Sequence, residues 1–115
     1  MIEITNRKQL IEEQPMIIVN GRLELTVAHI EALEPAFAAM EQASREENGC
    51  FDYTFSIEVN EPSTVRITER WESMEALRIH FASTHMGEFQ AALAEHSPTN
   101  AEVHFYEADR ELPRP

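Results

Sequence analysis

Hydrophobic and polar residues alternate in four segments of the chain, and this period of two predicts β-strands. The segments are residues 16–25, 51–59, 65–71 and 101–107. Within each segment the apolar positions fall on one face, so one side of the resulting sheet should be buried. The residues expected on this buried side are Ile17, Val19, Leu23, Leu25, Phe51, Tyr53, Phe55, Ile57, Val59, Val65, Ile67, Trp71, Val103 and Phe105.

Two further segments place hydrophobic residues three or four positions apart, which is the spacing of an amphipathic helix. The first begins after Thr26, a favourable N-cap, and runs to Asn48-Gly49, with Pro35 expected to kink or divide it. The second begins after Ser73, and Ser83-Thr84 offers a point of interruption within it. The expected core positions of the two helices are Ile30, Leu33, Phe37, Met40, Met74, Leu77, Phe81, Met86, Phe89 and Leu93.

The order of these elements, β-α-β-β-α-β, predicts an α+β fold of the ferredoxin-like type, with an antiparallel four-stranded sheet and both helices on one face. This domain should span residues 16–108, between an N-terminal extension, residues 1–15, and a C-terminal tail, residues 109–115. The opposite face of the sheet is mixed in character and is expected to carry Arg22, Thr54, Thr68, Arg70, His104 and Tyr106. We expect a second copy to cover this face, so that two sheets form a homodimeric α/β barrel.

Length and composition narrow the class of protein. A chain of 115 residues can bury one core, and a net charge of −12 argues against a nucleic-acid surface. No apolar run reaches the roughly 18 residues that span a bilayer, the N-terminus lacks a signal-peptide pattern, and the single Cys50 cannot form an internal disulfide. We therefore expect a cytoplasmic protein without nucleic-acid or membrane partners.

The segment from Glu69 to Phe89 gathers a carboxylate, an indole and two imidazoles. Strand parity places Glu69 on the apolar face beside Trp71, so its carboxylate needs a partner or a raised pKa. One explanation is structural, with Arg78, His80 or a backbone amide as the partner. The other is a role in a ligand pocket, and the sequence leaves both open.

The two imidazoles of this segment, His80 and His85, are candidates for acid–base chemistry. On an unbroken helix, five positions correspond to about 500° of rotation, so the two rings would not share a face. A break at Ser83-Thr84 would bring both to the rim of one cavity. Trp71, with Tyr53 and Phe55 on the same sheet face, could then form a flat wall for an aromatic ligand. Each of these side chains could instead have a structural role in the core.

Metal and cofactor sites are not expected. A metal site built from Glu69, His80 and His85 is disfavoured because the two histidines lack the i, i+4 spacing of a helical zinc motif. With three glycines and no glycine-rich phosphate loop, dinucleotide binding is also disfavoured.

Residues 16–107 resemble the antibiotic biosynthesis monooxygenase superfamily of dimeric α/β barrels. The features that match are Glu46-Glu47-Asn48-Gly49-Cys50-Phe51-Asp52-Tyr53, then Glu69-Arg70-Trp71-Glu72-Ser73, then His80-Phe81-Ala82-Ser83-Thr84-His85-Met86. In character the chain is most similar to the quinol monooxygenase and autoinducer-processing branches.

The resemblance implies a small pocket between the sheet and the helices, in which O₂ oxidises an aromatic polyol such as a hydroquinone without a metal or flavin. In that chemistry His80 would be the base or a hydrogen-bonding partner, Glu69 would orient it, and His85 would be a proton shuttle at the rim. The residues that would contact the substrate are Trp71, Tyr53, Phe55, Phe81 and Met86.

Other activities of the same superfamily define the alternatives. The haem-degrading members use an Asn, a Trp and a His where this chain has Gly21, His80 and Gln90, so haem degradation is disfavoured. An isomerase of a small hydroxyketone would use the same imidazoles and would work without O₂. A non-catalytic dimer that binds a small molecule is the third alternative, because one fold hosts many functions.

Overall fold

The computed structural model describes residues 15–115, and its elements follow the predicted order. They are β1 (Met16–Glu24), α2 (Val27–Arg45), β2 (Cys50–Glu58), β3 (Glu61–Trp71), α3 (Met74–Phe81), α4 (Thr84–Glu95) and β4 (Asn100–Ala108). Apart from Pro15, the predicted N-terminal extension lies outside the described residues. None of the described helices has the length and apolarity needed to cross a membrane.

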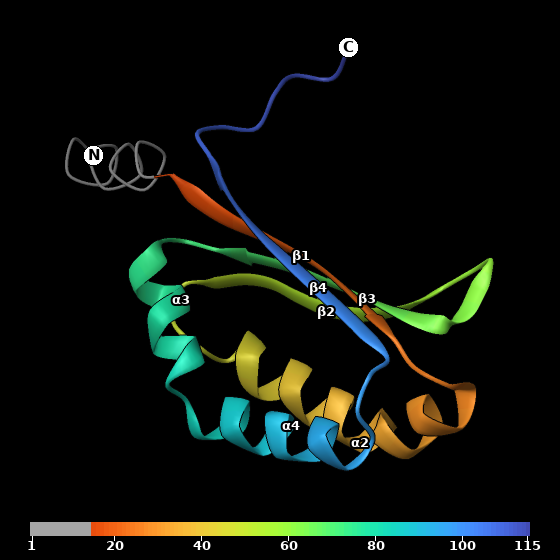
Figure 1. The fold of residues 1–115 in the computed structure, drawn as a ribbon. Helices are drawn as coiled ribbons and strands as arrows, with labels where there is room; N and C mark the ends of the chain where they lie inside the picture. The colour runs from red at the N-terminus through yellow and green to blue at the C-terminus, as the bar shows by residue number, and fades with distance from the viewer. Residues whose placement is uncertain (1–14) are drawn as a thin grey trace, which may run out of the picture.

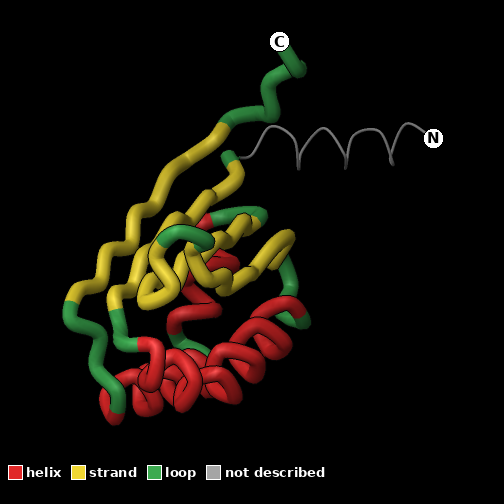
Figure 2. The backbone as a smooth tube through the Cα atoms, turned by 90° about the vertical axis from the view of Figure 1, so that its right-hand side faces the viewer, coloured by secondary structure: helices red, strands yellow, loops and turns green. Residues whose placement is uncertain are grey.

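The four strands form one antiparallel sheet in the order β2-β3-β1-β4. The helices of the described part of the chain all lie on one face of this sheet, as Figures 1 and 2 show from two directions. The predicted ferredoxin-like α+β fold is therefore confirmed. In the register of β1 with β3, Gly21 lies opposite Ile67, and a Cβ at Gly21 would meet the Ile67 side chain at 2.9 Å. Glycine at this position gives Ile67 the space to pack.

The core lies between the sheet and the helices and contains most of the residues expected there. Its fully buried members include Trp71, Leu33, Met40, Leu77, Val19 and Val65. The helix α2 is tied to the edge strand β2 by polar contacts as well. Glu41 Oε2 accepts a hydrogen bond from the backbone N–H of Phe55 at 2.7 Å, and Arg45 Nε donates to the carbonyl of Tyr53 at 2.8 Å. These contacts satisfy backbone groups on a strand whose outer edge has no neighbour in the sheet.

Several residues predicted to be buried are exposed. On the outer strand β4, Val103 and Phe105 lie opposite Gly21 and Val19, and so point to the helical side as predicted, but they are 41% and 48% exposed. The reason is position, because β4 is an outer strand of the sheet, and α2 and α3 make most of their contacts with the other three strands. The other exposed members of the predicted core are Phe51, Ile57, Val59, Met74 and Phe81.

The helix α3 is rotated relative to the prediction. Its buried positions are Ala76, Leu77 and His80, whereas Phe81 is 48% exposed. The prediction followed hydrophobicity alone, which assigned the imidazole of His80 to the edge of the apolar face. This ring can be buried because a carboxylate from another element satisfies one of its nitrogens.

The helix α2 ends earlier than predicted and continues through Pro35 as one element. Its last residue is Arg45 and its C-cap is Glu46, so residues 46–49 form a turn. Gly49 has a φ of +83°, and a Cβ there would lie 2.8 Å from the Cβ of Ala76. Glycine is therefore required both by the left-handed backbone and by the close approach to α3. This turn carries Glu47 toward the C-terminal end of α3.

Candidate functional site

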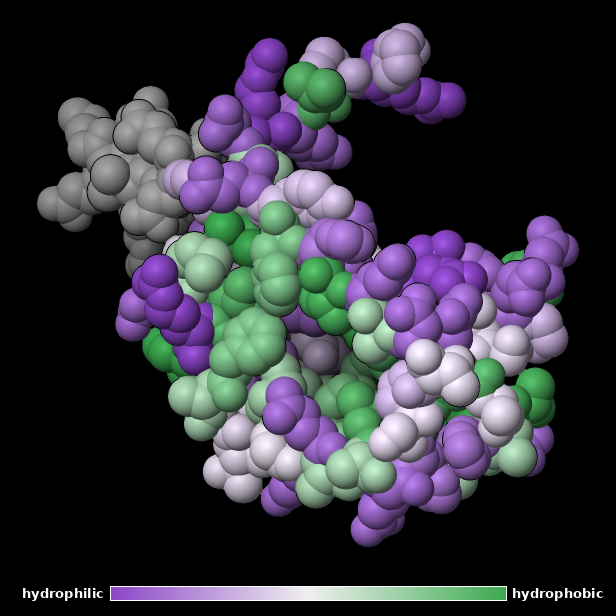
Figure 3. Space-filling model, in the orientation of Figure 1, coloured by the Kyte–Doolittle hydropathy of each residue, from purple (hydrophilic) through white to green (hydrophobic). Residues whose placement is uncertain are grey.

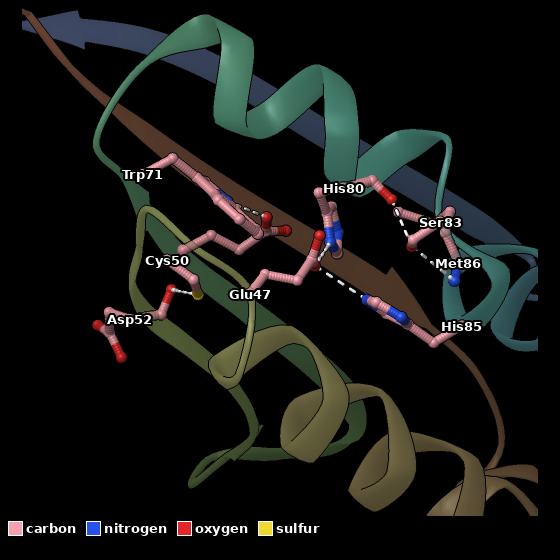
Figure 4. A network of polar contacts seen from close by, with 9 residues as sticks. Glu47, Cys50, Asp52, Trp71, His80, Ser83, His85 and Met86 are labelled. Carbon is pink, nitrogen blue, oxygen red and sulfur yellow. Dashed lines mark hydrogen bonds and ion pairs between the residues drawn. The ribbon is translucent and has the colours of Figure 1, made fainter.

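Glu47, in the turn after α2, contacts both imidazoles of the predicted site (Figure 4). Its Oε2 atom lies 2.6 Å from Nδ1 of His80 and 2.9 Å from Nε2 of His85. The side chain of His80 is 0% exposed, that of Glu47 13% and that of His85 22%. The cluster therefore extends from the core of the domain to its surface.

A break between α3 and α4 brings the two histidines together. The backbone leaves the helical path at Ala82 and Ser83, close to the predicted interruption. The Ser83 hydroxyl donates to the carbonyl of His80 at 2.6 Å and accepts from the backbone N–H of Met86 at 3.2 Å, so it ends one helix and caps the next. The two rings are 5.8 Å apart, between their centroids. The expectation that a break would bring His80 and His85 together is confirmed, although His80 is buried and does not lie at a rim.

The predicted contact between Glu69 and His80 is wrong. Glu69 is buried on the helix-facing side of β3, as strand parity predicted, but its Oε1 accepts a hydrogen bond from Trp71 Nε1 at 2.8 Å. Among the described residues, Glu47 is the carboxylate that contacts His80. The prediction missed Glu47 because it placed this residue inside a longer helix. The useful signal was its position two residues before a glycine that ends the helical segment.

Glu69 has both a partner and an altered ionisation. Burial, with a smaller contribution from the nearby charge of Glu47, raises its pKa to about 7, although the hydrogen bond from Trp71 acts in the opposite direction. The carboxyl group is therefore partly protonated near neutral pH. Its hydrogen bond fixes the orientation of the Trp71 indole.

This raised pKa predicts a pH-dependent stability. Because the folded state holds the Glu69 proton more tightly than the unfolded state, its contribution is fully present below about pH 4.5 and is lost as the pH rises through about 7. We expect the loss to be about 3 kcal/mol. Glu69→Gln is neutral at every pH, so its free energy of unfolding, measured in urea, should lack this decline.

The matched control for Glu69→Gln is Glu31→Gln, which removes an exposed carboxylate of α2. The control should decline with pH as the wild type does. Equal pH slopes in the wild type and in Glu69→Gln would show that the Glu69 carboxyl is not perturbed.

The imidazole of His80 is buried and favours the neutral form. Burial lowers its pKa and the proximity of His85 lowers it further, whereas Glu47 raises it through its hydrogen bond and its charge. Within the described part of the chain, His80 Nε2 has no hydrogen-bond partner although it is shielded from solvent. A buried polar atom of this kind is available to a ligand.

Aromatic rings enclose His80 on several sides. The centroid of its ring lies 4.6 Å from that of Trp71, 5.3 Å from that of Tyr53 and 5.7 Å from that of Phe81. Phe55 lies one ring further out, 5.5 Å from Tyr53. The predicted wall residues Trp71, Tyr53 and Phe55 therefore lie together. Phe81, predicted to contact the substrate, is half-exposed beside His80. Met86 is also buried, and its backbone N–H donates to the hydroxyl of Ser83.

The described cavities are not centred on His80. A cavity of about 450 Å³ lies between α2 and the strands β2 and β3, and Phe55 is its one lining residue from the predicted site. A second cavity of about 350 Å³ lies between α2 and α4 and is lined by His85. The side chain of His80 is itself 0% exposed, so a ligand must move a neighbouring side chain to reach it.

Two further features of this region concern its chemistry: the ionisation of the Cys50 thiol, and the potential of Glu47, His80 and His85 to bind a metal. Burial raises the pKa of Cys50 to about 11, so its thiol is a poor nucleophile at neutral pH. Glu47, His80 and His85 offer ligand atoms within 4.8 Å of one another, and their donor types are those that zinc binds. Both imidazoles hydrogen-bond directly to Glu47, so their positions can be explained without a bound ion.

Comparisons with solved structures agree with the fold. A structure from Deinococcus radiodurans whose name includes antibiotic biosynthesis monooxygenase is 28% identical, with a TM-score of 0.80, and the match covers 85% of this chain and 97% of the other. A conserved protein from Methanosarcina mazei is 20% identical, with a TM-score of 0.78, and the match covers 86% and 98% of the two chains. A protein from Shewanella oneidensis is 24% identical, with a TM-score of 0.74, over 82% and 91% of the two chains. No curated protein matches the chain in sequence.

The family model described as antibiotic biosynthesis monooxygenase matches residues 16–92. This range runs from the start of β1 into α4 and contains all three residues of the Glu47–His80–His85 cluster. Within this range, β2 supplies Tyr53 and Phe55 of the aromatic wall, and β3 supplies Trp71. The chain therefore belongs to the antibiotic biosynthesis monooxygenase family.

Proposed function

We propose that this protein is a monooxygenase that transfers one oxygen atom of O₂ to a small quinol-like aromatic substrate without a metal or flavin. The observation that carries the proposal is His80, a buried imidazole with one unpaired nitrogen enclosed by the rings of Trp71 and Tyr53. A neutral imidazole in an apolar pocket can accept the proton of a phenolic hydroxyl. The surrounding rings suit a flat aromatic ligand.

The proposed reaction balances without an external reductant. His80 Nε2 takes a phenolic proton, and the resulting anion reduces O₂ to a peroxide bound to a ring carbon. The C–H bond at that carbon and the O–O bond then break, which leaves a carbonyl oxygen on the ring and releases the second oxygen as water with two substrate hydrogens. The quinol supplies all the electrons and leaves as a hydroxyquinone. The protein must remove the proton and keep water from the anion.

Access to His80 would be from the side of Phe81. This ring contacts His80 and is also half-exposed, so its movement would open a path from solvent to the imidazole. Trp71 and Tyr53 would remain as the fixed wall, because both are buried and Trp71 is held by Glu69.

The test is O₂ consumption by metal-stripped protein with a panel of benzo- and naphthohydroquinones. Uptake well above the uncatalysed background with at least one quinol would support the proposal. Uptake at background across the panel would contradict it. Turnover of a hydroxyketone under anaerobic conditions would instead identify an isomerase, and ligand binding without turnover would identify a non-catalytic binding protein.

We also propose that the active form is a homodimer. Hydrophobic residues gather around α3 and β4 on the face of the molecule that Figure 3 shows. Phe81 of α3 and Val103 and Phe105 of β4 are 41–48% exposed. Phe81 and Phe105 lie in contact, with their ring centroids 6.0 Å apart. A second copy of the chain against the β4 part of this patch would bury Val103 and Phe105 and leave Phe81 free to move. This contact would lie on the helical side of the sheet, whereas the sequence predicted that the second copy covers the opposite face. Light scattering should give twice the mass of one chain, and a single-chain mass at all concentrations would contradict the dimer.

A further inference from the structure

We propose that Glu47 is the positioning residue of the site, fixing His80 in the tautomer that presents a bare Nε2 to the substrate, with His85 as a second donor that holds the Glu47 carboxylate in place. This inference rests on the proposed function for its effect on turnover. Its structural part can be tested without any substrate.

The argument begins with one oxygen atom that faces two ring nitrogens. Glu47 Oε2 lies 2.6 Å from His80 Nδ1 and 2.9 Å from His85 Nε2. A carboxylate accepts hydrogen bonds and donates none, so both facing nitrogens must carry hydrogen. In a neutral imidazole only one nitrogen is protonated, so His80 is protonated on Nδ1 and has a lone pair on Nε2.

The surroundings of His80 Nε2 agree with this tautomer. Among the described residues no acceptor lies within hydrogen-bond distance of this buried atom. A protonated Nε2 would therefore be a buried N–H without an acceptor, which costs free energy. The lone pair is also without a partner, and a substrate hydroxyl that donates to it would remove that deficit. The arrangement is thus matched to a ligand that carries an O–H group.

The position of Glu47 explains why this tautomer persists. The turn that carries it is closed by Gly49 against α3, and the C-terminal end of α3 is joined to α4 through Ser83. His85, from the first turn of α4, then makes the second hydrogen bond to the same oxygen. His85 was predicted to be a proton shuttle. Its Nε2 already carries the hydrogen that it donates to Glu47, so this nitrogen cannot receive a proton from the Glu47 carboxylate. The geometry favours a role in holding the carboxylate.

Three titratable groups face the His80 ring in the described part of the chain. They are Glu47 from the turn after α2, His85 from α4 and the phenol of Tyr53 from β2, whose own pKa is raised by burial. Of these, Glu47 is the group that favours the protonated form of His80, through its hydrogen bond and its charge. It would therefore stabilise the imidazolium that forms when His80 takes a substrate proton, without acting on the substrate itself.

The experiment uses ¹⁵N-histidine-labelled, metal-stripped full-length protein, and the tautomer of His80 is read from its ring nitrogen shifts. We expect the Nδ1-protonated form in the wild type and in Glu46→Gln, a control that removes a neighbouring exposed carboxylate. In Glu47→Gln this form should no longer be exclusive, because the amide can donate to a ring nitrogen as well as accept. An Nε2-protonated His80 in the wild type would overturn the proposal, and this result does not require that the variant folds.

Kinetics with the best quinol provide the second readout. In Glu47→Gln we expect kcat to fall at least about tenfold, with a smaller change in KM. The acidic limb of the pH profile should move to lower pH, because the group that raises the pKa of His80 has lost its charge. An unchanged pH profile in a folded Glu47→Gln protein would show that Glu47 is merely structural. If no quinol is oxidised, the tautomer measurement still decides the role of Glu47, so the two proposals fail separately.

Discussion

His80→Ala is expected to lower the kcat of quinol oxidation by about 10² to 10⁴-fold, the usual contribution of a general base. The variant removes the buried imidazole whose Nε2 is proposed to take the phenolic proton. Since Glu47 and the aromatic wall remain, substrate binding should be affected much less than the rate. The measurement is initial O₂ uptake as a function of quinol concentration.

Two controls separate loss of the base from loss of the fold. His104→Ala removes an exposed histidine of β4 on the opposite sheet face and should leave the rate unchanged. His80→Gln keeps a hydrogen-bonding side chain of comparable size next to Glu47 and should fold, yet it should be as inactive as the alanine variant. A folded His80→Gln protein with the wild-type rate would contradict the role of His80 as the base.

Trp71→Ala is expected to lower the free energy of unfolding by about 3–5 kcal/mol, the cost of removing a large aromatic side chain from a core. Trp71 is 0% exposed, and its ring packs against those of Tyr53 and His80. The substitution also leaves the Glu69 carboxyl without its donor, which adds the cost of an unpaired buried polar group. Urea unfolding of the variant and the wild type measures the difference.

Trp71→Phe separates the two contributions, because it keeps most of the ring and removes only the N–H donor. We expect it to cost about 1–3 kcal/mol, less than the alanine variant. A loss below about 1 kcal/mol for Trp71→Ala would contradict the assignment of Trp71 as the rigid wall of the site, since a side chain that packs tightly cannot be removed at so small a cost.

The fold could be predicted because the sequence signals are local. Alternation in 16–25, 51–59 and 65–71 identified the strands, and the position of Glu69 within the third of them gave its burial correctly. The break at Ser83 could also be predicted, because a side chain that caps a helix acts on its own next few residues.

The site could be predicted only in part, because its central contact joins distant segments. Glu47 and His80 are 33 residues apart, and nothing in the local pattern indicates that they meet. Glu69 was the nearer carboxylate in sequence and sits on the correct face, but the indole of Trp71 reaches it first. The exposure of Phe105 could not be predicted either, because alternation gives the face of a strand and not its place at the edge of the sheet.

The proposed activity and the proposed role of Glu47 make different demands on experiment. The role of Glu47 concerns one hydrogen bond and its tautomer, and can be examined in the resting protein. The proposed activity concerns the fate of O₂, and only the product of turnover reports on that.

The most direct measurement of the central claim is turnover of an active quinol under ¹⁸O₂ with mass analysis of the product. A monooxygenase of the proposed type should give a hydroxyquinone that contains one ¹⁸O atom, with the other released as water. An unlabelled quinone with hydrogen peroxide would show that the protein oxidises quinols without transferring oxygen, and unlabelled product formed equally well without O₂ would show that it is not an oxygenase.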